Sequence, residues 1–209
     1  MPFANLVTGT RCFTNPSTVL LIAALLLGGC TKSMTMQIDT QVPVAAMETM
    51  SLNIGVRYTE AFRTHVYREN TEDRQNWEIV TGDSQVALFD QILNSLFGRV
   101  SDIDSLESSE ADLMLLIEPV LDEMQLATPA ETGFEFYEAW LKYTVNVVDK
   151  VETGPKAFSF TAYGKQNKAR FTRLEKGLGQ AIEQALRDAG AKLTVELMKI
   201  PQVRNAIIQ

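Results

Sequence analysis

The sequence has 209 residues, of which 19 are basic and 26 are acidic, so the formal net charge at neutral pH is −7. An acidic chain is a poor ligand for nucleic acid or for an anionic membrane surface, because like charges repel. The length fits one domain with a sizeable hydrophobic core.

The first recognisable segment is an apolar run, residues 19–27, followed by two glycines and a cysteine. The run is about half as long as the roughly 20 apolar residues that span a bilayer, and it lacks the polar face of a core helix. A short apolar run before a small-residue site is typical of an export signal. The segment Leu27-Gly28-Gly29-Cys30 resembles the bacterial lipobox. This resemblance implies a signal peptide over residues 1–29 and lipid attachment at Cys30.

In lipobox proteins, the cysteine receives a diacylglyceryl group and becomes the first residue of the mature chain. Cleavage would leave 180 residues and, since it removes one arginine and no acid, a net charge of −8. No free thiol would remain, because Cys12 leaves with the signal. Several acyl chains, such as palmitate, anchor a protein stably, whereas one chain binds a bilayer only marginally. An aspartate after the cysteine usually retains such proteins in the inner membrane, so Thr31 implies the periplasmic face of the outer membrane.

Residues 30–49 are polar and show no regular period, so they predict a flexible acylated tether. Residues 52–58 alternate between apolar and polar side chains, which predicts a half-buried strand. The segments 64–68 and 77–80 predict a short hairpin that is joined by a polar turn.

A helix is predicted to follow, with Asp83 or Ser84 as its N-cap. Its apolar face comprises Val86, Phe89, Leu93, Leu96 and Phe97. Gly98 is expected to stop the helix in the left-handed conformation, and a polar, acidic loop is expected over 101–110.

Three further strands are predicted to form a meander, over residues 113–126, 137–147 and 158–163. Pro119 has no N–H to donate to a ladder, so the first of these strands is expected to be bulged or to lie at an edge there. Residues 128–133 hold a proline and a glycine and predict the first hairpin loop.

The last long element is a second amphipathic helix. Its apolar stripe comprises Leu174, Leu178, Ala181, Ile182, Ala185, Ala189 and Leu193. Gly177, Gly179 and Gly190 weaken the helix by about 1 kcal/mol each relative to alanine, and they favour a close approach to the sheet.

These elements predict an α+β fold. Both helices are expected to pack on one face of an antiparallel-dominated sheet of about four to five strands. The domain is predicted over residues 50–200, with a C-terminal tail over 201–209. This order of elements behind a lipobox resembles the small α/β outer-membrane lipoproteins of envelope biogenesis, namely the lipopolysaccharide-assembly lipoprotein and the auxiliary lipoproteins of ABC-type transporters. The resemblance implies a non-enzymatic scaffold or adaptor.

Two functions are compatible with these features. The first is an adaptor that docks an envelope protein complex through its sheet face or hairpin tip. The alternative is a lipid-binding module of an envelope lipid-transport system, which receives an acyl chain between the helices and the sheet. An enzyme is least favoured, because His65 is the only histidine and the mature chain has no Ser-x-x-Lys or glycine-rich phosphate loop. No cofactor or metal is expected.

Three aromatic residues lie at the start of the strand predicted over 137–147, on its less apolar face: Phe134, Phe136 and Trp140. Either they are buried under a hairpin or a loop, or they form an exposed patch that binds a partner or lipid.

The charges are segregated along the chain. Carboxylates crowd residues 102–138, where Lys and Arg are absent. A solvated acidic face is favoured over a calcium site, because Asp102-Ile103-Asp104 lacks the glycine and closing glutamate of an EF-hand. A basic loop follows, with Lys165, Lys168, Arg170 and Arg173. Either this is ordinary surface variation, or the two segments join copies of the chain, or the basic loop grips an acidic headgroup or a charged partner.

Overall fold

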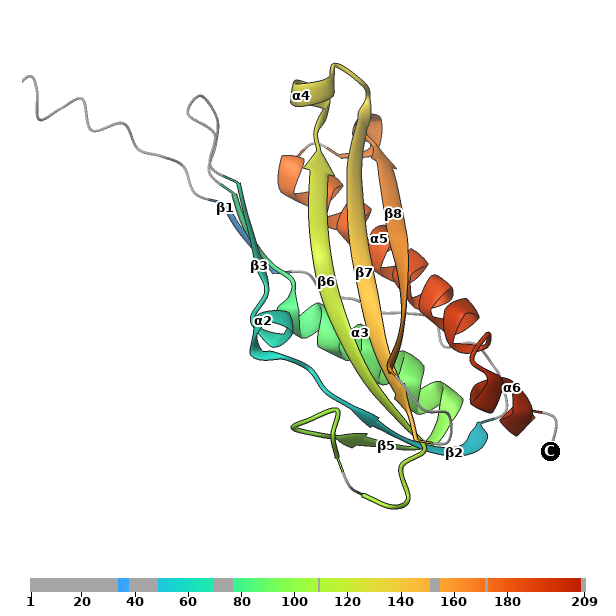
Figure 1. Ribbon diagram of the computed structural model, residues 1–209. Coiled ribbons are helices and arrows are strands. Elements are labelled where there is room, and N and C mark those ends of the chain that lie inside the picture. Colours follow the sequence, from blue (N-terminus) through green and yellow to red (C-terminus); the bar gives the residue numbers. More distant parts are fainter. Residues whose placement is uncertain are drawn as a thin grey trace, which may run out of the picture. The chain divides into compact units, whose positions relative to one another are not determined.

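The computed structural model describes residues 34–37, 49–69, 77–108, 110–150, 155–171 and 173–207 (Figure 1). Cys30, the predicted signal peptide and most of the predicted tether lie outside the described residues. Within the described ranges, the strands form two sheets, accompanied by five α-helices and one short 3-10 helix. No helix in these ranges combines the length and the apolar character that crossing a bilayer requires.

The larger sheet has five strands in the order β5-β2-β6-β7-β8. Their bounds are β2 (Met50–Val56), β5 (Phe97–Asp102), β6 (Leu115–Ala127), β7 (Phe136–Asp149) and β8 (Pro155–Asn167). Strand β2 runs parallel to both of its neighbours, β5 and β6, whereas β6, β7 and β8 are successively antiparallel. The predicted α+β class is confirmed, but the predicted dominance of antiparallel pairing is wrong, because the sheet is mixed.

The parallel pairing follows from helix α3 (Gly82–Leu96), which carries the chain back along the sheet. Parallel neighbours need such a crossover, and Phe97, the first residue of β5, lies beside Met50, the first residue of β2.

Two expectations about the ends of α3 are wrong. The helix is capped by Thr81 instead of Asp83 or Ser84. Gly98 lies in β5 and not in a left-handed cap, because the chain is already extended at Phe97.

The meander is confirmed, and its central strand alternates as predicted. In β7, the six odd-numbered residues from Tyr137 to Val147 are buried, while the even-numbered residues between them are half-buried or exposed. Strand β6 is continuous through Pro119, with one bulge between Leu121 and Glu123. Pro119 lies beyond Ile117, the last residue of β6 that pairs with β2. Strand β2 therefore does not pair with β6 at Pro119, where the N–H is missing. This agrees with the predicted edge position.

Helices α3 and α5 (Leu174–Leu197) both lie on one face of this sheet (Figure 1). Leu93 of α3 and Leu178 of α5 are both fully buried. The two helices also meet each other, because a Cβ at Gly190 of α5 would lie 3.1 Å from Leu88 of α3. The predicted packing of both helices on one face is confirmed.

The smaller sheet has the strand order β1-β4-β3. Strands β3 (Val66–Glu69) and β4 (Trp77–Val80) form the predicted hairpin, and β1 (Met34–Gln37) pairs with β4 in parallel. Four residues of the predicted tether are thus a strand. Three short helices complete the described fold: α2 (Glu60–Arg63), α4 (Pro129–Thr132) and α6 (Pro201–Ile207). Helix α6 lies in the predicted tail, and its Val203 is fully buried.

The outer edge of β8 is covered by side chains of α5. Polar groups at four-residue steps along the helix meet backbone groups at two-residue steps along the strand. These are Asp188, which accepts from Tyr163 N (2.8 Å); Gln184, which accepts from Lys165 N (3.2 Å); and Lys192, which donates to Thr161 O (2.7 Å). The steps match, because four helical residues rise about 6 Å and two strand residues about 6.6 Å. This edge is closed to a further strand.

Candidate partner-binding surface

The described residues cover only one part of the face of the larger sheet that lies opposite α3 and α5. Near β2, the loop after β5 places Ile103 and Leu113 against Leu116 of β6, and these three residues form a second, smaller apolar cluster. Toward the turn between β6 and β7, the outward-facing positions of β7 and β8 are half-buried or exposed. We call this second part the open face. It is defined by Phe136, Glu138 and Trp140 of β7 and by Tyr163 and Lys165 of β8.

Two paired aromatic residues occupy the centre of the open face. Trp140 lies directly opposite Tyr163 in the β7–β8 register, and their ring centroids are 5.3 Å apart at a tilt of 39°. The Tyr163 hydroxyl donates to Glu138. Burial, assisted by this carboxylate, raises the pKa of Tyr163 to about 12, so the hydroxyl stays protonated and remains a donor to Glu138. A half-buried tryptophan held against a fixed tyrosine provides a preorganised aromatic contact.

A third aromatic residue, Phe136, lies beneath a lysine on the same face. The Lys165 ammonium is 3.8 Å from the centroid of the Phe136 ring, a cation–π geometry. The same ammonium lies 3.8 Å from Glu138. Of the predicted binding residues, Phe136, Trp140 and Lys165 are thus brought together. Phe136 and Trp140 are half-buried, between the fully buried and the fully exposed alternatives.

Phe134 projects from the turn between β6 and β7, and its side chain is 65% exposed. Local hydrogen bonds and a glycine define the shape of this turn. Thr128 and Glu131 form a capping box at α4, and Gly133 adopts the left-handed conformation at φ 72°. The exposed ring is therefore presented at a defined position beyond the open face.

The remaining basic residues of the predicted site also lie at this end of the molecule. Lys168 starts the 3-10 helix η1 (Lys168–Arg170). Its N–H donates to Glu135 O at 2.9 Å, and its ammonium is 4.0 Å from the Glu135 carboxylate. Arg170 and Arg173 are exposed and form no ion pair within the described residues. Part of the charge segregation is thus explained within one chain, because the acidic and basic segments face each other across the β7–β8 hairpin.

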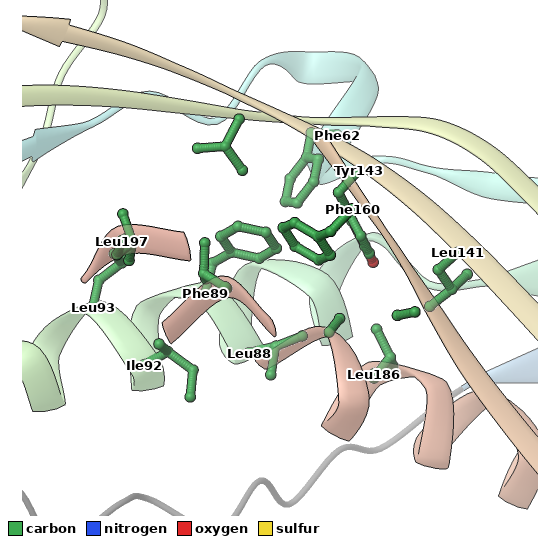
Figure 2. Close-up of a cluster of buried hydrophobic side chains, with 14 of the residues drawn as sticks. Phe62, Leu88, Phe89, Ile92, Leu93, Leu141, Tyr143, Phe160, Leu186 and Leu197 are labelled. Carbon is green, nitrogen blue, oxygen red and sulfur yellow. The ribbon is translucent and has the colours of Figure 1, made fainter. Parts of the chain in front are cut away.

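The space between the helices and the sheet is filled. A Cβ at Gly164 of β8 would lie 1.9 Å from Ala181 O of α5, and one at Gly177 would lie 2.2 Å from the Tyr137 ring. Both distances are shorter than real Cβ contacts, so the α5 backbone rests directly on the sheet. Figure 2 shows the adjoining cluster of aromatic rings. Its members are Phe62, Phe89, Tyr143 and Phe160, with neighbouring ring centroids 5.5 to 6.5 Å apart.

A shallow, mostly apolar groove of about 180 Å³ lies at the other end of α5. Phe158, Ile200 and Pro201 contribute apolar walls, and Lys156 and Lys199 also line it. Lys199 is engaged by Glu196 at 2.5 Å. The groove is smaller than the roughly 300–1,000 Å³ of ordinary ligand pockets.

His65, which is half-buried, belongs to a series of hydrogen-bonded polar side chains. Its Nδ1 lies 2.7 Å from Thr81 Oγ1. Gln85 donates to the same oxygen at 3.0 Å, and its own carbonyl accepts from the fully buried Tyr143 hydroxyl at 2.9 Å. Burial lowers the pKa of His65. These hydrogen bonds connect the start of α3 to the centre of β7. No local sequence pattern predicted them, because the residues involved are far apart in the sequence.

The described residues hold no cluster of three or more His, Cys, Asp or Glu side chains in metal-binding proximity. Sequence reasoning also missed Glu138 and Tyr163 as members of the open face. The β7–β8 register was the signal that could have found Tyr163, since it places this residue opposite Trp140.

No protein-family model matches the chain, and no curated protein matches it in sequence. Among solved structures, the chain resembles a Xanthomonas campestris protein of the family DUF330, with a TM-score of 0.54 and 12% identity over 82% of this chain and 99% of that one. A Helicobacter pylori protein, described provisionally as a homologue of the neuraminyllactose-binding hemagglutinin, gives a TM-score of 0.46 and 12% identity over 82% and 97%. A Caulobacter crescentus protein, described provisionally as a lipoprotein, gives 0.37 and 9% over 56% and 80%. At these identities, the Xanthomonas likeness shows a shared small α/β fold and nothing more.

Proposed function

We propose that this chain is a lipid-anchored adaptor on the periplasmic face of the outer membrane, which docks an envelope protein through its open face. The observation that supports this most is the Trp140–Tyr163 pair, which lies on an uncovered part of the sheet while the interior is closely packed. Aromatic residues held rigidly at a surface are the residue types that dominate binding energy at protein interfaces. The proposal includes no catalytic step and no cofactor.

The anchoring part of the proposal rests on the sequence. The segment Leu27-Gly28-Gly29-Cys30 matches the lipobox pattern after an apolar run, and Thr31 favours sorting to the outer membrane. Acylation at Cys30 would confine the domain to a membrane surface, where a partner of the same envelope raises its effective concentration.

A lipid-binding module is the second candidate. The groove lined by Phe158, Ile200 and Pro201 favours it. The contacts of Gly164 and Gly177 with α5 and the sheet disfavour it, because an acyl chain between the helices and the sheet would have to displace the α5 backbone. Native mass spectrometry of the protein purified from membranes distinguishes the two. A stoichiometric, non-covalent lipid lost on Phe158→Asp substitution would favour the second candidate.

The docking part is tested by crosslinking from the open face. A photoreactive residue in place of the exposed Lys142, two residues from Trp140 on β7, should capture an envelope protein in the bacterial host. Trp140→Ala should weaken the binding of this partner by about 30-fold, which corresponds to roughly 2 kcal/mol for an aromatic anchor. The matched control is Val195→Ala, because Val195 is an exposed apolar residue on α5, 57% accessible, away from the open face. Docking through this face would be refuted if the photoreactive protein captured the partner equally well without a further substitution, with Trp140→Ala and with Val195→Ala.

The basic residues supply a separate, electrostatic part of the proposal. Arg170 and Arg173 are proposed to contact an acidic surface on the partner or on a second copy of the chain. Their replacement by Glu should weaken association mainly at low salt, because exposed charges are screened over about 8 Å at physiological ionic strength. Sedimentation of the purified protein would identify a second copy as the partner. Association that is unchanged by the double substitution at every salt concentration would remove this part and leave the aromatic part intact.

A further inference from the structure

Strand β6 extends well past its neighbour β2, so part of its edge has no paired strand. Strand β2 pairs with β6 only from Leu115 to Ile117, whereas β6 continues to Ala127. The last contact runs from Arg57 N to Ile117 O, at 2.8 Å. Within the described residues, no strand pairs with this side of β6 beyond that contact. Figure 1 shows β6 continuing past the end of β2.

The register identifies the backbone groups on this free edge. Successive residues of a strand direct their N–H and C=O groups to opposite sides. Before the bulge, the odd-numbered residues face β2, as Ile117 does. The extra residue between Leu121 and Glu123 shifts the alternation. The groups that point away from β7 are therefore those of Leu121, Met124 and Leu126, which we call the β6 edge.

The two sides of the sheet are treated differently. The edge of β8 is closed by Asp188, Gln184 and Lys192 of α5. The described residues supply no corresponding side-chain caps for the β6 edge. Proteins usually protect a long unpaired edge. Here Pro119 precedes the edge and the bulge between Leu121 and Glu123 lies within it, and no described strand pairs with the stretch from Leu121 to Leu126 on the side away from β7.

The surroundings of the β6 edge are acidic. Asp122 and Glu123, which lie within this stretch, are both exposed. Tyr67 of β3 donates to Glu69 at 3.0 Å. Burial, together with the carboxylates of Glu69 and Glu131, raises the pKa of Tyr67. The carboxylates of Glu69 in β3 and Glu131 in α4 thus lie near Tyr67, and Asp122 and Glu123 add two carboxylates on β6 itself.

We propose that the β6 edge receives an extended segment of the partner protein, and that this segment carries basic side chains. This inference rests on the proposed adaptor function and names the form in which the partner binds. In strand addition, main-chain hydrogen bonds supply affinity, and alternate side chains supply specificity. Here the acidic surroundings select basic residues. A second copy fits less well, because antiparallel pairing of two β6 edges would bring Asp122 and Glu123 of each copy against the same carboxylates of the other.

The experiment measures amide hydrogen exchange in the full-length protein with two synthetic probe peptides. One alternates lysine with valine, and the other alternates glutamate with valine. The lysine peptide should slow exchange of the amides of Leu121, Met124 and Leu126 by at least about tenfold, since a new ladder protects them. It should leave the amide of Gln125, which faces β7, unchanged, and the glutamate peptide should have no effect.

A pair of variants tests the charge argument. Glu123→Lys should abolish the protection by the lysine peptide, whereas Glu107→Lys, the same change at an exposed acidic residue in the loop between β5 and β6, should retain it. Absence of protection in the unmodified protein would overturn the proposal, as would equal protection in Glu123→Lys. Protection of the same amides without any peptide, together with dimers in sedimentation, would overturn it in favour of a second copy. These amides are read separately from Trp140, so failure here is distinguishable from failure of docking through the open face.

Discussion

Gly164→Ala is the most direct test of the closed interior that separates an adaptor from a lipid carrier. A Cβ at this position would lie 1.9 Å from Ala181 O and 2.5 Å from Ala185 N, both of them backbone atoms of α5. Ordinary contact begins at 3.4 Å, so the helix would have to move by about 1.5 Å. Flexible side chains cannot absorb this shift, because the obstruction is the helix backbone.

The expected cost is at the upper end for an overpacked core, about 3 kcal/mol. Displacement of α5 would also stretch the bonds from Asp188 to Tyr163 N and from Gln184 to Lys165 N, each worth about 1 kcal/mol. Urea unfolding followed by circular dichroism would show a lower midpoint with an unchanged slope.

The matched control is Gly98→Ala, where the nearest heavy atom would lie 3.2 Å from the new Cβ. A shift of a few tenths of an ångström accommodates it, so the free energy of unfolding should change by less than about 1 kcal/mol. The reasoning would be refuted if Gly164→Ala behaved like this control. Tolerance of the extra methyl group would mean that α5 lifts from the sheet easily, and the lipid-binding alternative would regain its main requirement.

Four further expectations follow from the same structure. Leu93→Ala and Leu178→Ala should each cost about 2–5 kcal/mol in denaturant melts, since both side chains are fully buried; a loss under half a kcal/mol would mean that the helix face is not buried. Tyr143→Phe should cost about 1–3 kcal/mol, because it leaves a buried amide oxygen without its donor; a neutral effect in the same melts would show that this hydrogen bond is unimportant. Burial lowers the pKa of His65 below its ordinary 6.5, so the unfolded chain binds a proton at higher pH than the folded one. Stability should therefore fall as the pH drops through 6.5, and His65→Gln should remove that part of the pH dependence; identical pH profiles for the two proteins would contradict this. Cys30→Ala should abolish acylation and release the protein from membranes or leave it unprocessed, and a mature species without acyl mass in the unmodified protein would contradict the lipid anchor.

The basic loop shows how pairing changes the meaning of a sequence pattern. Along the chain, Lys165 and Lys168 are far from any acid and suggested contacts with another molecule. In the fold, Lys165 lies 3.8 Å from Glu138 and Lys168 lies 4.0 Å from Glu135, because each pair lies in or directly beside the adjacent antiparallel strands β7 and β8. For Arg170 and Arg173, contact with another molecule stays a prediction, since the described residues supply no ion pair for them.

The sequence by itself determined the local elements whose patterns reflect one-sided burial. Alternation marked β7, and a 3.6-residue stripe marked α3 and α5, because each of these buries one continuous face. Only the tertiary structure decided which strands pair and what each surface becomes. Three features join residues that are distant in sequence: the parallel pairing of β2, the hydrogen bonds that link His65 to Tyr143, and the pairing of Trp140 with Tyr163. The free edge of β6 arises in the same way, because it depends on where β2 ends. A local sequence pattern indicates that a residue is buried, but it does not identify the neighbour that buries it.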